Sequence, residues 1–182
     1  MAANHLEDLV TEWYQLQGYF VRRNVQVGKR TQGGYDCELD VVAFHPGFQK
    51  LVHIEPSLDG DRWDKREQRY AKKFAAGRLH IPALFEGLTL PAELEQVALF
   101  VYGGGDRATV GGGRVVFIRE FMREVLTKIR ARRVSSAAVP EQYPLLRTLQ
   151  FAAQYWPVGA EAAVSTASRR TRAKAGRTGR GT

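Results

Sequence analysis

The sequence has a single cysteine, Cys37, and no apolar run as long as a membrane-spanning helix, which needs about 18 residues. One thiol excludes an internal disulfide and any zinc cluster built on several cysteines. A basic segment followed by an apolar stretch, which would mark a signal peptide, is also missing, so we expect a cytoplasmic protein. Cys37 begins a strand-like run and is interpreted as a small residue of the core.

Apolar and aromatic residues, at 44% and 10%, are numerous enough to build one core of ordinary size from 182 residues. We therefore expect a single domain over residues 1–156. Residues 157–182 consist largely of Ala, Gly, Ser, Thr and Arg, which offer little surface to pack. They are predicted to form a disordered basic tail.

The net charge of +8 is unevenly distributed along the chain. The predicted tail carries six basic residues and one acid, which leaves a net charge of only +3 on residues 1–156. A basic tail can attract phosphate groups without sequence preference, through Coulomb attraction and counterion release. It can equally serve as a solubilising extension, and both roles stay open at this point.

Hydrophobic periodicity predicts helices and strands in alternation. Apolar residues recur at helical spacing in 4–17, 61–76 and 119–133, and a last helix is expected to begin at Pro140. Five strand-like runs cover 19–28, 36–44, 50–56, 96–105 and 114–118. Gly77 is expected to end the second helix. A strand, a helix and a further strand in succession form a parallel crossover. The sequence therefore predicts an α/β fold of three layers, α/β/α, around a central mixed sheet of about five strands.

The second and third predicted strands, joined by a Pro-Gly turn, form a hairpin that carries acidic residues. Glu38 and Asp40 alternate with apolar residues, so both project from one face of their strand. With the turn centred near Gly47, Asp40 lies opposite residue 54, or opposite Glu55 if the register shifts by one. Two carboxylates on neighbouring strands would then lie within about 5 Å of each other and repel.

Two interpretations of these acids remain. In the first, Mg²⁺ lies between the carboxylates and activates water for phosphodiester hydrolysis, because the ion neutralises phosphate charge and lowers the pKa of bound water. In the second, Glu38 and Asp40 belong to a solvated strand face, and Glu55 pairs with a nearby arginine. Acids alternate in many strands, so spacing alone favours the second interpretation.

The order of elements around the acids resembles the PD-(D/E)XK, or restriction-endonuclease-like, nuclease superfamily over residues 5–118. The matching features are Glu7 in the first helix, Glu38-Leu39-Asp40 in a strand, and Glu55-Pro56-Ser57 at the end of the next strand, before a basic helix. The resemblance implies that Asp40 and Glu55 bind a catalytic Mg²⁺, for which Mn²⁺ can substitute. It also implies that Glu7 contributes to the metal shell, directly or through water.

The sequence departs from this family at Ser57, where the motif has a lysine. A serine hydroxyl can hydrogen-bond a water molecule, but it carries no positive charge. On the following helix, Arg66 and Lys73 flank the apolar stripe, and the resemblance includes nucleases in which the lysine is relocated to this helix. Either side chain could supply the missing charge, although arginine cannot act as a general base. The alternative is a solvated basic helix face that contacts a DNA backbone.

Three functional hypotheses follow. The first is a Mg²⁺-dependent endonuclease that acts on DNA, with a homodimer as a compatible assembly because two sites then address both strands. The second is a catalytically inactive protein of the same fold that binds nucleic acid or a protein partner. The third is an interaction domain in which the acids only hold structure.

His53 shares a strand face with Glu55 and is interpreted as a packed residue.

Overall fold

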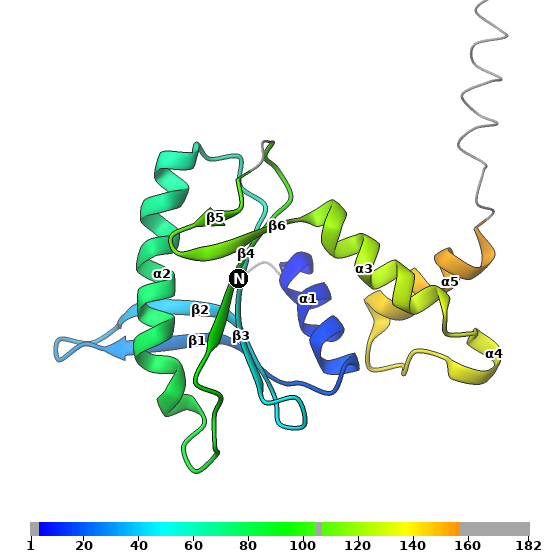
Figure 1. Cartoon of the computed structure of the whole chain (residues 1–182), viewed down its shortest axis with the longest axis horizontal. Helices are drawn as coiled ribbons and strands as arrows, with labels where there is room; N and C mark the ends of the chain where they lie inside the picture. The colour runs from blue at the N-terminus through cyan, green and yellow to red at the C-terminus, as the bar shows by residue number, and fades with distance from the viewer. Residues whose placement is uncertain (1–3, 105–106, 157–182) are drawn as a thin grey trace, which may run out of the picture.

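The computed structural model describes residues 4–104 and 107–156 of the chain. Six strands are found there, namely β1 (Phe20–Lys29), β2 (Tyr35–His45), β3 (Lys50–Ser57), β4 (Leu94–Phe100), β5 (Thr109–Val110) and β6 (Gly113–Phe117). The helices in the same residues are α1 (His5–Leu16), α2 (Trp63–Leu84), α3 (Ile118–Arg130), α4 (Val134–Ala137) and α5 (Pro144–Tyr155). Figure 1 shows their arrangement. The predicted tail, 157–182, lies outside the described residues.

One mixed sheet contains all six of these strands, in the order β1-β2-β3-β4-β6-β5. The first three strands are antiparallel, β4 and β6 run parallel to β3, and β5 returns antiparallel to β6. The predicted mixed α/β sheet is thus confirmed. The predicted number of about five strands is wrong, because the two-residue β5 is too short to produce a periodic pattern in the sequence.

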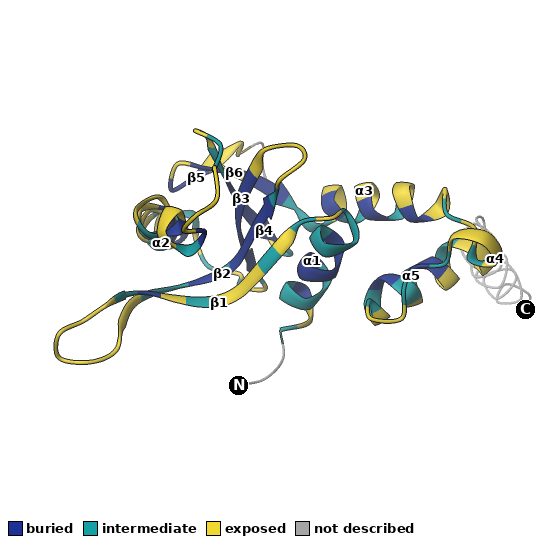
Figure 2. Ribbon diagram, turned by 90° about the horizontal axis from the view of Figure 1, so that it is seen from below, coloured by how far each residue is buried: buried dark blue, intermediate teal, exposed yellow. Residues whose placement is uncertain are grey.

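Helices cover both faces of the sheet, as Figures 1 and 2 show. On one face, α1 and α3 pack against apolar side chains of β2, β3, β4 and β6, and α5 closes this cluster through the buried Leu146. On the other face, α2 covers two further clusters, one around Phe44 and Ile81 and one around Phe74 and Phe100. None of the described helices combines the length and the apolar character that crossing a membrane requires.

The start of α5 is set by a contact with the opposite end of the chain. The helix begins at Pro144 and not at the predicted Pro140, and just before it the N–H of Tyr143 closes a turn onto the Pro140 carbonyl. Glu12 of α1 accepts hydrogen bonds from the N–H groups of Leu145 and Leu146, at 3.3 and 2.9 Å. A carboxylate at a helix N-terminus satisfies free N–H groups and interacts favourably with the helix dipole.

The helix α2 does not end at Gly77, as predicted, but continues to Leu84. The glycine is needed because α2 crosses β3 and β4 at close range. A Cβ atom at this position would clash with His53 Nδ1, and it would lie 2.7 Å from His53 Cε1 and 3.1 Å from the Gln96 side chain. Gly77 is therefore a point of close packing between helix and sheet.

Helix propensity and packing predict opposite effects for Gly77→Ala. Alanine favours a helix by about 1 kcal/mol over glycine, but the added methyl group collides with a buried imidazole ring. We expect packing to dominate, with the free energy of unfolding lowered by about 1–3 kcal/mol in urea unfolding.

Gly60→Ala is a suitable control, because nothing lies within 4 Å of a Cβ at that position. A Gly77→Ala protein that is more stable than the wild type would contradict the close approach of α2 to β3.

Candidate active site

The site lies where β2 and β3 separate. Their ladder ends at the pair Val41 and Ile54, so Asp40 and Glu55 are the next residues on each strand and lie opposite each other. On the other side of Asp40, Asn24 of β1 has a left-handed backbone with φ 50° and is missing from the β1–β2 ladder. The N–H of Asp40 donates to Glu55 Oε1 at 3.3 Å. Of the two registers considered from the sequence, the structure has the one that brings both carboxylates together.

Lys73 of α2 joins the two carboxylates. Its Nζ donates to Asp40 Oδ1 at 2.7 Å and also to Glu55 Oε2. The side chain of Glu55 is 1% exposed, that of Asp40 14% and that of Lys73 24%, so solvent reaches the cluster on the side of Asp40 and Lys73. Because like charges on neighbouring strands repel, the ammonium group supplies the cation that the pair requires.

Glu7, the third predicted acid, lies near this cluster on α1. The side chain of Asn4 donates to Glu7 Oε1, and Arg23 of β1 approaches Glu7 Oε2 at 3.9 Å. Burial raises the pKa of Glu7, and the negative charge of Asp40 raises it further. Glu7 is therefore within electrostatic reach of Asp40, although no hydrogen bond between Glu7 and Lys73 is found in the described residues.

The structure places Ser57 and Arg66 in a different network, built around Asp59 in the loop after β3. The Ser57 hydroxyl donates to Asp59, and the Asp59 N–H donates to Ser57 Oγ at 3.2 Å. Arg66, 2% exposed, donates to Asp59 Oδ1 at 3.1 Å and to the Tyr102 carbonyl at 2.9 Å. Its guanidinium also lies 4.3 Å from the ring centre of Phe100. These contacts connect the loop to the end of β4, and the structure does not bring Arg66 to the carboxylate pair.

The charges and the burial of the cluster shift its pKa values. Burial raises the pKa of Asp40 from 3.8 to about 7, with Glu55 adding to the rise and Lys73 opposing it. Burial by itself lowers the pKa of Lys73, but Glu55 and Asp40 together raise it above its ordinary value of 10.5. Lys73 is therefore a fixed positive charge at neutral pH, whereas Asp40 changes its charge close to neutrality.

His53, interpreted from the sequence as a packed residue, is both packed and a direct partner of the site. It is fully buried on β3, and its Nε2 lies 2.7 Å from Glu55 Oε1. Burial and, to a smaller extent, the charge of Lys73 lower the pKa of His53 to about 3, so the imidazole is neutral at physiological pH. The alternation of His53 with Glu55 along the strand indicates that both side chains lie on the same face. Spacing alone cannot distinguish a packed histidine from a hydrogen-bonding partner of Glu55.

The carboxylates of Asp40 and Glu55 are a donor set that suits Mg²⁺. Both reach one nitrogen atom of Lys73, so a single cation placed between them can contact both. Proteins commonly hold Mg²⁺ with one or two carboxylates, and water or phosphate oxygens complete its shell. Across 4–104 and 107–156, no set of three or more His, Cys, Asp and Glu side chains forms a metal-binding group. The site therefore offers two protein ligands to a metal ion, and water and substrate would supply the remaining ligands.

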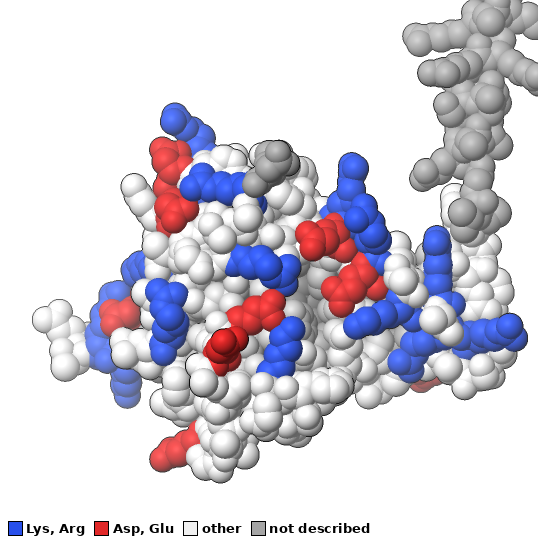
Figure 3. All heavy atoms as spheres, in the orientation of Figure 1, with Lys and Arg blue, Asp and Glu red and all other residues white. Residues whose placement is uncertain are grey.

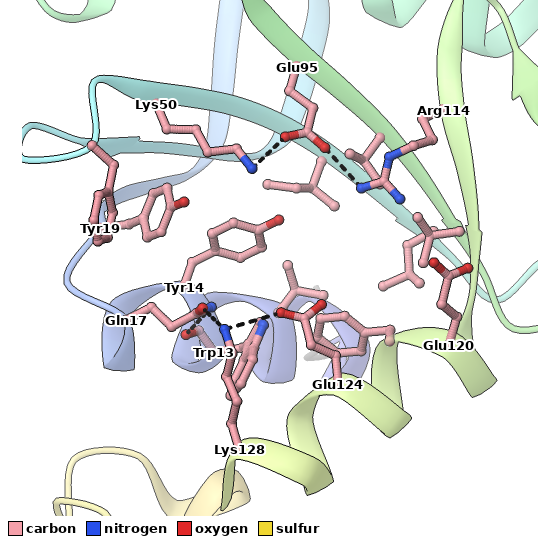
Figure 4. A pocket seen from close by; sticks show the side chains of 17 residues that line it. Trp13, Tyr14, Gln17, Tyr19, Lys50, Glu95, Arg114, Glu120, Glu124 and Lys128 are labelled. Carbon is pink, nitrogen blue, oxygen red and sulfur yellow. Dashed lines mark hydrogen bonds and ion pairs between the residues drawn. The ribbon is translucent and has the colours of Figure 1, made fainter.

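A separate cleft of about 360 Å³ lies on the opposite face of the sheet, between β4, α1 and α3 (Figure 4). Glu95 of β4 bridges Lys50 and Arg114 there, at 2.9 Å each, and the Tyr14 ring projects into the space. Acidic and basic side chains flank this hollow in the space-filling view (Figure 3). None of the predicted site residues lines it.

A comparison of the chain with protein-family models and with curated proteins finds no match. The chemistry of the Asp40, Glu55 and Lys73 cluster is the remaining indication of function. Three features distinguish it: two carboxylates with little exposure, a bridging cation, and an aspartate whose pKa is strongly shifted. Strongly shifted pKa values are concentrated at functional sites.

The raised pKa of Asp40 makes stability depend on pH. Between pH 3.8 and about 7, the folded protein holds a proton that the unfolded chain releases, so this contribution to the free energy of unfolding falls as the pH rises. Asp40→Asn stays neutral throughout this range. We expect the variant to exceed the wild type in the free energy of unfolding by about 1 kcal/mol at pH 8. The difference should shrink at pH 5, as measured by urea unfolding at both pH values.

Glu93→Gln, at an exposed position, is the matched control and should show no such pH-dependent difference. A variant Asp40→Asn that is less stable than the wild type at pH 8 would show that the ion pair with Lys73 outweighs the cost of burying the carboxylate.

Proposed function

We propose that the protein is a metal-dependent nuclease of the restriction-endonuclease-like fold, which hydrolyses phosphodiester bonds in DNA. The observation that carries the proposal is the position of Lys73, whose ammonium group contacts both Asp40 and Glu55. It supplies positive charge next to the carboxylate pair, where Ser57 supplies none. The order of helix, three strands, helix and strand around these residues supports the same assignment.

In the proposed reaction, Asp40 and Glu55 hold Mg²⁺. The ion, when bound, supplies a polarised water molecule and neutralises charge on the phosphate. Lys73 remains protonated because both carboxylates raise its pKa, so its role is to stabilise negative charge on the phosphate and not to remove a proton. Glu7, whose pKa is raised by burial and by the charge of Asp40, is the third acid of the proposed site and would contribute to the metal shell through water.

The distribution of charge supports a nucleic-acid substrate. On the face seen in Figure 3, basic side chains gather over α3 and α4, beside acidic side chains. The exposed basic residues of this region are Arg119, Arg123, Lys128, Arg130 and Arg133. Such a surface attracts the phosphates of a nucleic acid, and its affinity for them falls steeply as the salt concentration is raised.

A second candidate function is a protein of the same fold that binds nucleic acid or a protein partner without cleaving. The observation that favours it is that Lys73 already lies between the two carboxylates, and one ammonium group balances the pair without a metal whenever Asp40 is protonated. The Ser57 hydroxyl, which bonds Asp59, also adds no catalytic group.

Cleavage assays separate the two functions. The purified full-length protein is incubated with plasmid and single-stranded DNA in the presence of Mg²⁺ or Mn²⁺. We expect cleavage by the wild type and none by Asp40→Ala or Glu55→Ala, which remove metal ligands. Lys73→Met should lower the cleavage rate by about 10²- to 10³-fold, the loss typical for one group that stabilises charge in a transition state.

Lys72→Met is the matched control, because it removes the same charge from the adjacent, exposed position of α2. It should leave the cleavage rate within a few-fold of the wild type. If the wild type cuts no better than Asp40→Ala, yet binds DNA with a steep salt dependence, the nuclease proposal fails and the binding function takes its place.

A further inference from the structure

The imidazole of His53 lies next to Glu55 and is enclosed by Phe74 and Gly77 of α2 and by Gln96 of β4. It is 0% exposed, and the Phe74 ring of α2 packs against it edge to face, with ring centres 5.4 Å apart. Gly77, one turn further along α2, leaves no space for even a methyl group beside the ring. The fourth neighbour is Gln96 of β4, whose Nε2 lies 3.2 Å from His53 Nδ1. These neighbours leave the ring little room, so its hydrogen bonds depend on where its proton resides.

The orientation of the Gln96 amide follows from two partners with fixed chemistry. The carbonyl of Phe74 can only accept, and it lies 2.9 Å from Gln96 Nε2. The guanidinium of Arg78 can only donate, and it lies 2.6 Å from Gln96 Oε1. A flipped amide would place oxygen against oxygen and nitrogen against nitrogen at these two contacts. The NH₂ group of Gln96 therefore faces the imidazole.

This orientation determines the tautomer of His53. Because Gln96 donates to Nδ1, that nitrogen accepts, and the proton of the neutral ring resides on Nε2. Nε2 lies 2.7 Å from Glu55 Oε1, so the imidazole donates to the carboxylate. A chain of donors thus runs from Arg78 through Gln96 and His53 to one oxygen atom of Glu55.

We propose that His53 is a positioning residue for the proposed nuclease site, held as the Nε2–H tautomer by Gln96 so that it orients the Glu55 carboxylate. With Oε1 bound by His53, the other oxygen, Oε2, is directed to the position that Lys73 and Asp40 share. The inference rests on the proposed function, because orientation matters catalytically only if Glu55 holds a metal. The imidazole orients the carboxylate without adding charge, so the negative charge of Glu55 remains available to a cation. Partners that orient metal ligands typically contribute 10- to 100-fold to metal affinity.

The tautomer can be measured directly on the full-length wild-type protein. Long-range ¹H–¹⁵N NMR correlations distinguish the protonated from the unprotonated imidazole nitrogen, and the chain has only four histidines to assign. We expect Nε2 of His53 to carry the proton and Nδ1 to be bare. A protonated Nδ1 in the neutral ring would overturn the proposal, whatever the protein does to DNA.

Variants then test the positioning role by Mn²⁺ binding, measured by electron paramagnetic resonance. His53→Gln retains an N–H donor near the position of Nε2, whereas His53→Leu removes it. We expect His53→Leu to weaken Mn²⁺ binding by about 10- to 100-fold and His53→Gln to restore most of the loss. Equal Mn²⁺ affinity in the wild type and His53→Leu would overturn the proposal.

Gln96→Glu provides an independent test if His53→Leu does not fold. The variant keeps the shape of the side chain and a partner for Arg78, but it presents only acceptors to Nδ1. We expect a proton on Nδ1 in the NMR spectrum and weaker Mn²⁺ binding than in the wild type. Wild-type protein with the Nε2 proton but without Mn²⁺ binding would overturn both the proposed function and the positioning role. Mn²⁺ binding that His53→Leu leaves unchanged would overturn the positioning role alone.

Discussion

Two carboxylates on neighbouring strands and one ammonium group between them are the interaction on which the rest of this site depends. Asp40 and Glu55 meet because the β2–β3 ladder ends one residue before them, and Lys73 reaches both from α2. Without a cation, the burial of this pair would be strongly unfavourable. Helix and sheet are thus joined electrostatically at the position where the chemistry is proposed to occur, so the packing of α2 and the charge balance of the site cannot vary independently.

The close approach of α2 serves this arrangement. Gly77 lets the helix lie directly on β3 and β4, and the same approach encloses His53 between Phe74 and Gln96. Hydrophobic clusters on either side of this point, around Ile81 and around Phe100, fix the helix along its length. A site with its supporting residues on helix and strand is held more rigidly than one built on loops.

The sequence predicts much of the fold, because periodicity reports which residues face the core. It predicts β2 and β3 within one residue and the mixed character of the sheet, but it misses the two-residue β5. Long-range contacts explain two further errors. Gly77 was expected to end a helix, because glycine has low helix propensity, and its tertiary role has no local signature. The start of α5 depends on Glu12, more than 130 residues earlier in the chain.

For the site, too, the sequence predicts some features and leaves others open. Asp40 and Glu55 could be placed on facing strands from spacing and resemblance, but not in a definite register. Helical geometry left both Arg66 and Lys73 as candidates. The structure separates them because Asp59 and Tyr102 hold Arg66 in a different network. That distinction depends on the loop after β3, whose course no periodic pattern predicts.

The contact between Glu12 and the start of α5 has a consequence for the order in which the protein is made. The residues that form the sheet, α2 and the carboxylate cluster are all synthesised before Pro144 leaves the ribosome. Until then, Glu12 lacks the two N–H partners that it has in the finished fold. The nascent chain therefore contains every residue of its proposed chemical centre before α1 can gain its contact with α5.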